Sequence, residues 1–252
     1  MPKNIIAVLN QKGGVGKTTT AINLAAYLAK DGHSVLLVDA DPQGNSTSGL
    51  GLDKQNQSAT LYDVLFSRAQ ALSSIQKINS KLHIIPSNAN LAGAEVELVP
   101  LAGRELKLRQ ALDGLDYDYV LIDCPPSLGL LTINALTAAN SVLIPVQAEY
   151  YALEGISQLL SVIQQVRQSI NPGLEVLGVL ITLFDSRNSL SSHVKQELAN
   201  YFGAKLFETV VPRNVRLAEA PSYGRTIIEH DKWSKGARAY KALAKEVEKR
   251  TP

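Results

Sequence analysis

Apolar positions follow two different spacings along this chain. Short runs rich in β-branched residues have the length and composition of strands that are buried on both faces of a sheet. The strands predicted from these runs are Asn4 to Leu9, Val35 to Asp39, Leu82 to Pro86, Tyr119 to Asp123, Val142 to Val146, Val176 to Thr182 and Leu206 to Val211. Such uniform hydrophobicity is typical of a parallel sheet.

Longer segments between these strands have apolar residues at helical spacing. The helices predicted there are Thr18 to Lys30, Gly103 to Leu115, Leu130 to Ala139, Leu153 to Ser169, Leu190 to Phe202 and Gly236 to Lys249. Because strands alternate with helices, the sequence predicts an α/β fold with a doubly wound, mostly parallel sheet and helices on both faces. No linker or repeat divides the chain, so we expect one domain over residues 1–252.

The composition sets limits on the class of protein. The chain has 252 residues, of which 45% are hydrophobic and 19% charged, as in an ordinary globular protein. Cys124 is its only cysteine, which excludes a disulfide framework and any site built on several thiolates within the chain. The first apolar run is too short for a signal segment or a membrane span, so the cytoplasm is the expected compartment.

A glycine-rich segment lies between the first predicted strand and the first predicted helix, which is the context of a phosphate-binding loop. Its residues are Lys12, Gly13, Gly14, Val15, Gly16, Lys17, Thr18 and Thr19. Glycines let backbone N–H groups converge on phosphate oxygens, and the helix dipole adds to the attraction. Lys17 would then reach the β- and γ-phosphates of ATP, and the Thr18 hydroxyl would bind Mg²⁺. The alternative is a glycine-rich turn that merely opens a helix.

The loop departs from the standard phosphate-loop pattern in a specific way. Its first position is Gln11 rather than glycine, and an additional lysine, Lys12, follows. The string resembles the deviant Walker A motif of the ParA/MinD family of ATPases. That resemblance implies an ATP-sandwich homodimer in which Lys12 reaches the ATP of the partner subunit. From the residue alone, a solvated loop charge is an equal alternative.

Two carboxylates frame the end of the second predicted strand. Asp39 and Asp41 are followed by Pro42-Gln43-Gly44, which is rich in turn signals. The segment resembles the family's Walker A′ motif. The resemblance implies that Asp41 positions and polarises the attacking water and that Asp39 belongs to the surroundings of Mg²⁺. The alternative, that one of the two merely caps the turn, is less favoured.

A third carboxylate, Asp123, ends another predicted strand and is followed by Cys124-Pro125-Pro126-Ser127. This segment resembles the family's Walker B motif, which implies that Asp123 holds Mg²⁺ through a water molecule and helps to orient Thr18. Cys124 has no candidate histidine base nearby in the sequence, so we expect it to pack rather than to act as a nucleophile.

The segment from Val210 to Pro221 closely resembles the chromosomal ParA, or Soj, branch of the family, as does the segment from Gln43 to Gly51. The resemblance implies that Pro212 and Asn214 contact adenine, since a flat apolar surface beside an amide can recognise a purine edge. The likeness covers nearly the whole chain and is least distinctive over residues 52–105.

Basic residues are concentrated near the end of the chain, although the net charge is only +2. They are Arg187, Lys195, Arg213, Arg216, Arg225, Lys232, Lys235, Arg238 and Lys241. Such clustering suits non-specific contact with DNA phosphates, and the resemblance implies that an ATP dimer binds duplex DNA through Arg187 and Arg216. Ordinary solvated surface charge is the alternative. Trp233 alone cannot form a single-strand stacking platform, and we expect it to pack.

Three other kinds of protein that resemble this chain have features that it lacks. The segment from Ala242 to Pro252 lacks the set of large apolar residues that membrane insertion needs, unlike the end of MinD-like proteins, so no membrane partner is expected. Cys124 alone cannot supply the cluster ligands of a nitrogenase iron protein. The stretch from Met1 to Gln11 is too short for the helix-turn-helix domain of larger plasmid partition proteins.

A small ParA of the Soj branch remains the leading hypothesis. The resemblance implies weak, Mg²⁺-dependent ATP hydrolysis that a ParB-type partner stimulates, so that a nucleoid-associated dimer drives chromosome or plasmid partitioning. Two alternatives stay open at this point. One is a ParA-like ATPase that positions another cargo, and the other is a MinD-like regulator of cell division.

Overall fold

The computed structural model describes residues 2–149 and 152–251. Its strands form one sheet in the order β3-β4-β2-β5-β1-β6-β7-β8, in which all neighbours are parallel except β3 and β4. The strands are β1 Asn4–Val8, β2 Val35–Asp39, β3 Gln76–Lys77, β4 Leu82–Ile85, β5 Tyr119–Asp123, β6 Ser141–Gln147, β7 Glu175–Phe184 and β8 Leu206–Pro212. The predicted mostly parallel α/β sheet is confirmed, and its continuity supports the proposal of one domain over residues 1–252.

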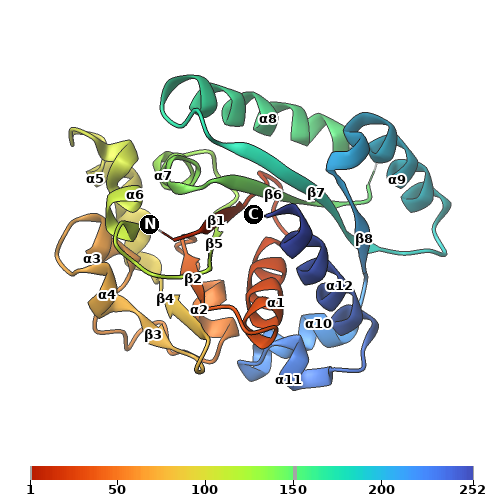
Figure 1. Cartoon of the computed structure of the whole chain (residues 1–252), viewed down its shortest axis with the longest axis horizontal. Coiled ribbons are helices and arrows are strands. Elements are labelled where there is room, and N and C mark those ends of the chain that lie inside the picture. Colours follow the sequence, from red (N-terminus) through yellow and green to blue (C-terminus); the bar gives the residue numbers. More distant parts are fainter. Residues whose placement is uncertain (1, 150–151, 252) are drawn as a thin grey trace.

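Helices cover both faces of this sheet. Figure 1 shows α7, α8 and α9 on one side and α1, α11 and α12 on the other. The α-helices are α1 Lys17–Lys30, α2 Asn45–Gly49, α3 Leu61–Leu65, α4 Ala71–Ser74, α5 Ala94–Glu97, α6 Lys107–Leu112, α7 Leu130–Ala138, α8 Ala152–Ser169, α9 Ser189–Phe202, α10 Val215–Glu219, α11 Ile227–Asp231 and α12 Lys235–Arg250. Short 3₁₀ helices are η1 Ala89–Gly93, η2 Arg104–Leu106, η3 Gly203–Lys205 and η4 Ala220–Tyr223.

The two faces of the sheet belong to two separate hydrophobic cores. In β1, Ile5 and Ala7 point into the core that α5 to α9 cover, whereas Ile6 and Val8 point into the core that α1 and α12 cover. Successive side chains of a strand point to opposite faces, so a central strand needs apolar residues at every position. This requirement explains why the strands read as continuous hydrophobic runs.

One predicted helix, Gly103 to Leu115, is wrong in its extent. Gly103 adopts φ 66°, outside the right-handed helical region, and a 3₁₀ turn leads from it into α6. The helix ends where Asp113 turns extended and Gly114 adopts φ 80°. The remaining predicted helices and strands differ from the observed bounds by at most two residues at either end.

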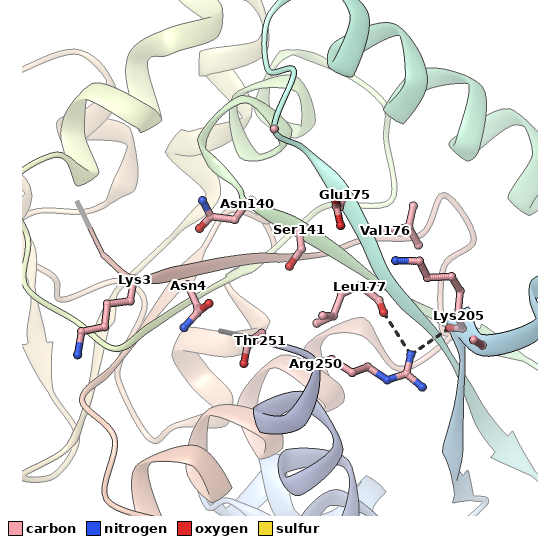
Figure 2. Close-up of a pocket in the computed structure, with 12 residues that line it drawn as sticks. Lys3, Asn4, Asn140, Ser141, Glu175, Val176, Leu177, Lys205, Arg250 and Thr251 are labelled. Atoms are coloured by element: carbon pink, nitrogen blue, oxygen red, sulfur yellow. Dashed lines mark hydrogen bonds between the residues drawn. The ribbon is translucent and has the colours of Figure 1, made fainter.

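The amino edge of the sheet is closed by Arg250 at the end of α12. Its Nη1 donates to the carbonyl oxygens of Leu177 (3.2 Å) and Lys205 (3.4 Å), and its guanidinium carbon lies 4.1 Å from the centroid of the Phe207 ring. Figure 2 shows the two hydrogen bonds of Arg250 to Leu177 and Lys205 beside a cavity. This cavity has a volume of about 470 Å³. A Cβ at Gly178 would lie 2.7 Å from Nη1, so the approach requires glycine there. The C-terminal helix is thus fixed to β7 and β8.

Candidate nucleotide and magnesium site

The glycine-rich loop joins the carboxyl end of β1 to α1, as predicted. Gly14 and Gly16 adopt φ 75° and 85°, conformations that favour glycine, and Gly16 is the N-cap of α1. No side chain caps this helix end, which leaves its first N–H groups directed at the loop. The hydroxyl of Thr182 in β7 donates to the carbonyl oxygen of Val15 (2.7 Å) and holds the loop against the sheet. The arrangement is that of an anion-binding site.

The two lysines of the loop have different environments. Lys17 is 7% exposed, and its Nζ donates to the carbonyl oxygen of Lys12 (3.1 Å) inside the loop. Burial lowers the pKa of Lys17, while the charges of Asp123 and Asp41 oppose that shift. Lys12 instead points outward, and its Nζ lies 2.5 Å from Oε2 of Glu149. Lys17 is therefore placed for a phosphate in its own loop, whereas Lys12 is accessible at the surface.

Two of the predicted carboxylates lie side by side in the sheet. Asp39 and Asp123 are paired Cα partners at the ends of β2 and β5, and both are fully buried. Burial and their mutual repulsion raise the pKa of Asp39, and burial raises the pKa of Asp123 above its usual range. A cation bound here would relieve this cost, because it favours the charged form of both groups.

One oxygen of Asp123 has no hydrogen bond of good geometry, although the nearby Thr18 hydroxyl lowers the pKa of this carboxyl. The Ser46 hydroxyl donates to its Oδ2 (2.8 Å), whereas its Oδ1 is buried and has no hydrogen-bond partner among the described residues. Such an oxygen is suited to bind a water molecule or a cation. Residues 2–149 and 152–251 contain no group of three His, Cys, Asp or Glu side chains arranged as a complete metal site. In nucleotide sites, Mg²⁺ binds through one or two carboxylates together with waters and substrate phosphates.

Asp41 stands in a turn whose backbone is held by the side chains of Asp39 and of Asp41 itself. Asp39 Oδ1 accepts from the N–H of Asp41 (3.3 Å), and Asp41 Oδ1 accepts from the N–H of Gln43 (2.9 Å). Both side chains thus cap N–H groups that the tight turn leaves without other partners, which adds to the roles predicted for them and does not replace those roles. Capping uses one oxygen of Asp41, and its predicted role toward water stays a prediction.

Three residues that the motifs did not single out complete this turn. The Thr47 hydroxyl donates to Asp39 Oδ2 (2.7 Å) and accepts from the N–H of Ser87 (2.9 Å). The Ser87 hydroxyl in turn donates to the carbonyl oxygen of Asp41 (2.8 Å), and Ser46 contacts Asp123 as described above. Thr47 and Ser87 are fully buried. The sequence offered one signal for Ser87, which is its position just after the carboxyl end of β4, since α/β sheets bind ligands at that edge.

Replacing Thr47 by valine tests this network. The change keeps the shape but removes one of the hydrogen bonds to Asp39 and leaves the Ser87 N–H without its partner, so we expect a loss of about 1–3 kcal/mol in the free energy of unfolding. Because the Asp41 turn loses a support, we also expect ATP hydrolysis to fall more than ATP affinity. Urea unfolding and steady-state hydrolysis measure both effects. Ser48→Ala, which removes a hydroxyl bonded to the carbonyl oxygen of Gly44, is the control; hydrolysis at the wild-type rate in Thr47→Val would contradict the role.

The predicted adenine residues lie beside the phosphate loop. Pro212 and Asn214 line a cavity of about 120 Å³ together with Gly14 and Gly16. Asn214 Oδ1 accepts from the N–H of Leu217 (3.2 Å) and caps α10, a short helix that follows β8 and was not among the predicted helices. Leu183, also at this cavity, has the strained φ of 51°. The cavity joins the two predicted parts of one nucleotide site.

The predicted DNA-contacting arginines lie near the same edge of the sheet. Arg187 is exposed and pairs with Asp185 (2.8 Å) in the loop after β7. Arg216 on α10 pairs with Glu219 (2.9 Å) and lies 3.7 Å from Asp231. The N–H of Arg213 donates to the carbonyl oxygen of Phe184 (3.0 Å), which joins the loop after β7 to the end of β8. The side chains of Arg187 and Arg216 are both accessible to a large ligand.

Two expectations about packing had opposite outcomes. Cys124 is fully buried in the core, and burial raises the pKa of its thiol, so it packs as predicted. The expectation that Trp233 packs is wrong, since its side chain is 78% exposed. It stands in the turn between α11 and α12, and the core is filled instead by Tyr240, Leu243 and other residues of α12.

Across the described parts of the chain, we find no helix with the length and hydrophobicity of a membrane span.

Comparison with known proteins gives a consistent result. A family model described as an AAA domain matches residues 3–176. The chain is 55% identical to the Bacillus subtilis sporulation initiation inhibitor protein Soj over 96% of this chain and 97% of that protein. It is 53% identical to the Thermus thermophilus chromosome-partitioning ATPase Soj over 96% and 94%. A solved structure of Mycobacterium smegmatis cobyrinic acid a,c-diamide synthase with an ATP analogue and magnesium bound has a TM-score of 0.86, with 41% identity over 96% of this chain and 93% of that one.

Proposed function

This chain belongs to the ParA/Soj family of chromosome-partitioning ATPases, and from that premise we propose that it is an ATP-dependent dimer switch that binds DNA non-specifically. In this proposal, ATP and Mg²⁺ bind at the carboxyl edge of the sheet, two subunits enclose the nucleotides, and the dimer attaches to duplex DNA. Hydrolysis then ends the attached state.

The nucleotide site is assigned to the residues already described. The N–H groups of Gly13 to Thr19 and the Lys17 ammonium would surround the phosphates, and the adenine would enter the cavity beside Pro212 and Asn214. Mg²⁺ would be held by Thr18 and Asp123, with Asp39 in the surroundings of the ion. When bound, the ion neutralises charge on the phosphates. Asp41 would orient the attacking water. The buried, unpartnered Oδ1 of Asp123 is the observation that supports the metal assignment.

Dimerisation is assigned to Lys12. Its ammonium is half exposed and faces out of the phosphate loop, where it pairs with Glu149. An exposed ion pair of this kind stabilises by at most about 1 kcal/mol, so the lysine is free to exchange Glu149 for a more strongly charged ligand. A triphosphate held by a partner subunit is such a ligand. The position therefore suits a contact across a nucleotide-containing interface.

The two-sided character of α10 is the observation that carries the DNA-binding proposal. Leu217 and Ala218 line the nucleotide cavity, whereas Val215 and Arg216 point into solvent on the same short helix. A nucleotide that shifts or orders α10 would thus change the presentation of Arg216 directly. This gives a physical route by which DNA affinity depends on ATP. Arg187, near the same edge, would contribute a second phosphate contact.

The remaining parts of the proposal concern the cell. A nucleoid-associated, cytoplasmic ATPase with slow turnover would be stimulated by a ParB-type protein, and the resulting cycle would partition a chromosome or plasmid. Positioning of another cargo would use the same residues and the same DNA attachment. Residues 242–247 contain Leu243 and Val247, which are buried against the body of the protein, so this helix presents no apolar face to a membrane.

Retention on random-sequence duplex DNA tests the proposal. With ATP at low salt we expect retention, and with ADP, without nucleotide or at high salt we expect little, because phosphate contacts release counterions. Arg216→Glu should lose retention while still binding ATP, and Arg167→Glu, on the exposed side of α8, serves as the matched control. Absence of retention for the wild type under every nucleotide would refute DNA attachment and leave the ATPase assignment standing.

A further inference from the structure

The turn between α11 and α12 displays an aromatic side chain that the fold does not use. Trp233 is the only tryptophan of the chain and is 78% exposed. The Nζ of Lys232 lies 5.3 Å from the centroid of its ring. Exposed apolar area is unfavourable in water, and a large aromatic ring at the surface marks a contact site more often than a small apolar residue does. The packing of this protein gives no reason for tryptophan at this position.

Hydrogen bonds hold the backbone of the turn that carries the ring. The N–H of Trp233 donates to Asp231 Oδ1 (3.1 Å), and the Ser234 hydroxyl donates to the carbonyl oxygen of Asp231 (2.9 Å). Ser234 Oγ also accepts from the N–H of Ala237 (3.1 Å) and caps α12. A side chain on such a preorganised turn loses little further conformational freedom when it binds a ligand. The geometry therefore favours a contact role.

The same turn is joined to the arginine already assigned to DNA. Asp231 Oδ2 lies 3.7 Å from Nε of Arg216, so one carboxylate contacts Arg216 with one oxygen and the backbone of Trp233 with the other. Nearby, the ring of Tyr223 stacks on His230 with centroids 5.2 Å apart. Trp233 and Arg216 thus belong to one continuous surface, which we name the Trp233 surface and define as Arg216, Lys232, Trp233 and Lys235.

The charge around the Trp233 surface identifies its partner. Residues 213–241 contain seven Lys or Arg against three Asp or Glu, in a chain whose net charge is only +2. The three acids are engaged, because Glu219 and Asp231 contact Arg216 and Glu229 caps α11. Lys232 and Lys235 form no ion pair with any described residue and are exposed. A polyanion complements this surface, whereas a basic or neutral protein face does not.

We propose that Trp233 contacts the sugars and base edges of duplex DNA while Lys232 and Lys235 contact the flanking phosphates. Apolar side chains that touch the minor groove beside basic residues are an established way of binding DNA without reading its sequence. Duplex rather than single-stranded DNA is the chosen ligand, because one ring cannot provide the series of stacking faces that single strands require. The proposal rests on the DNA attachment proposed above and extends it to a residue with no phosphate-binding group.

The single tryptophan makes a direct measurement feasible. Full-length protein with a non-hydrolysable ATP analogue is titrated with dye-labelled random duplex, and label anisotropy and tryptophan emission are recorded together over a range of salt. We expect DNA to change the tryptophan emission in parallel with binding. Trp233→Ala should weaken binding about tenfold with an unchanged salt slope. Lys232→Ala should instead lower the slope of log K against log salt by about 1.

Matched variants separate this inference from the DNA attachment itself. Trp233→Phe should retain most of the affinity, and Tyr201→Ala, which removes another exposed aromatic at the opposite edge of the sheet, should bind like the wild type. If the wild type binds duplex but its emission does not change and Trp233→Ala binds equally well, the inference is wrong and the DNA attachment stands. Tighter binding to single strands than to duplex would overturn the choice of ligand. If the wild type binds no DNA, both proposals fail.

Discussion

Asp41→Ala is expected to hydrolyse ATP about 10²- to 10⁴-fold more slowly than the wild type while still binding it. The carboxylate stands in a turn that Asp39, Thr47 and Ser87 hold in place, and it is 8% exposed at the carboxyl edge of the sheet. A group held this firmly can orient one water molecule for in-line attack on the γ-phosphate. Its loss removes that orientation without removing any phosphate contact of the loop.

The measurements for Asp41→Ala are steady-state phosphate release and equilibrium ATP binding. Because ATP would persist in the site, the variant should also remain dimeric and on DNA for longer than the wild type. Asp41→Asn keeps the hydrogen bond from Gln43 but not the charge, so it should fold normally and still hydrolyse slowly. Rapid turnover by Asp41→Ala would remove Asp41 from the catalytic role and direct attention to another carboxylate at this edge.

Lys17→Ala is expected to weaken ATP binding by about 100-fold or more, which corresponds to roughly 3 kcal/mol. The Lys17 ammonium is buried in the phosphate loop. In place of water it has one hydrogen bond to a carbonyl oxygen and the attraction of two carboxylates. A bound phosphate would compensate this desolvation, so most of the interaction energy appears only when nucleotide is present. Fluorescent-nucleotide titration measures the loss.

Lys12→Ala is the matched comparison for Lys17→Ala. Lys12 belongs to the same loop, but its side chain is half exposed and pairs with Glu149. We therefore expect Lys12→Ala to bind ATP nearly as well as the wild type and to fail in ATP-dependent dimerisation, as followed by light scattering. Equal loss of nucleotide affinity in the two variants would show that both lysines serve their own loop. An ATP dimer formed by Lys12→Ala would separate the extra lysine from the interface.

Strong local signals explain why the central sheet was predictable. Val35–Asp39 and Tyr119–Asp123 agree with the predicted bounds, because a strand buried on both faces must be apolar at each position. The short helices between residues 45 and 97 were not predicted. Helices of four or five residues contain little more than one turn, so they show no helical periodicity, and tertiary contacts decide whether they form.

The phosphate loop and the three aspartates were also visible in the sequence, since each lies at or just after the end of a strand of clear pattern. Their mutual geometry was not. That Asp39 and Asp123 are neighbours follows from the order β2-β5-β1, which no local pattern specifies. The contact between Thr47 and Ser87 was decided by the fold, which brings residues 40 positions apart into hydrogen-bond contact.

By itself, the sequence determined the long helices and the central strands and which loop has the form of a phosphate-binding loop, because these depend on the chemistry of neighbouring residues. Tertiary structure alone decided which groups meet across the carboxyl edge, how the Asp41 turn is supported and which side chains remain outside. Trp233 illustrates the difference. Its hydrophobicity predicted burial, but α12 fills the core with Tyr240, Leu243 and Val247, and the turn before that helix directs the ring to the solvent.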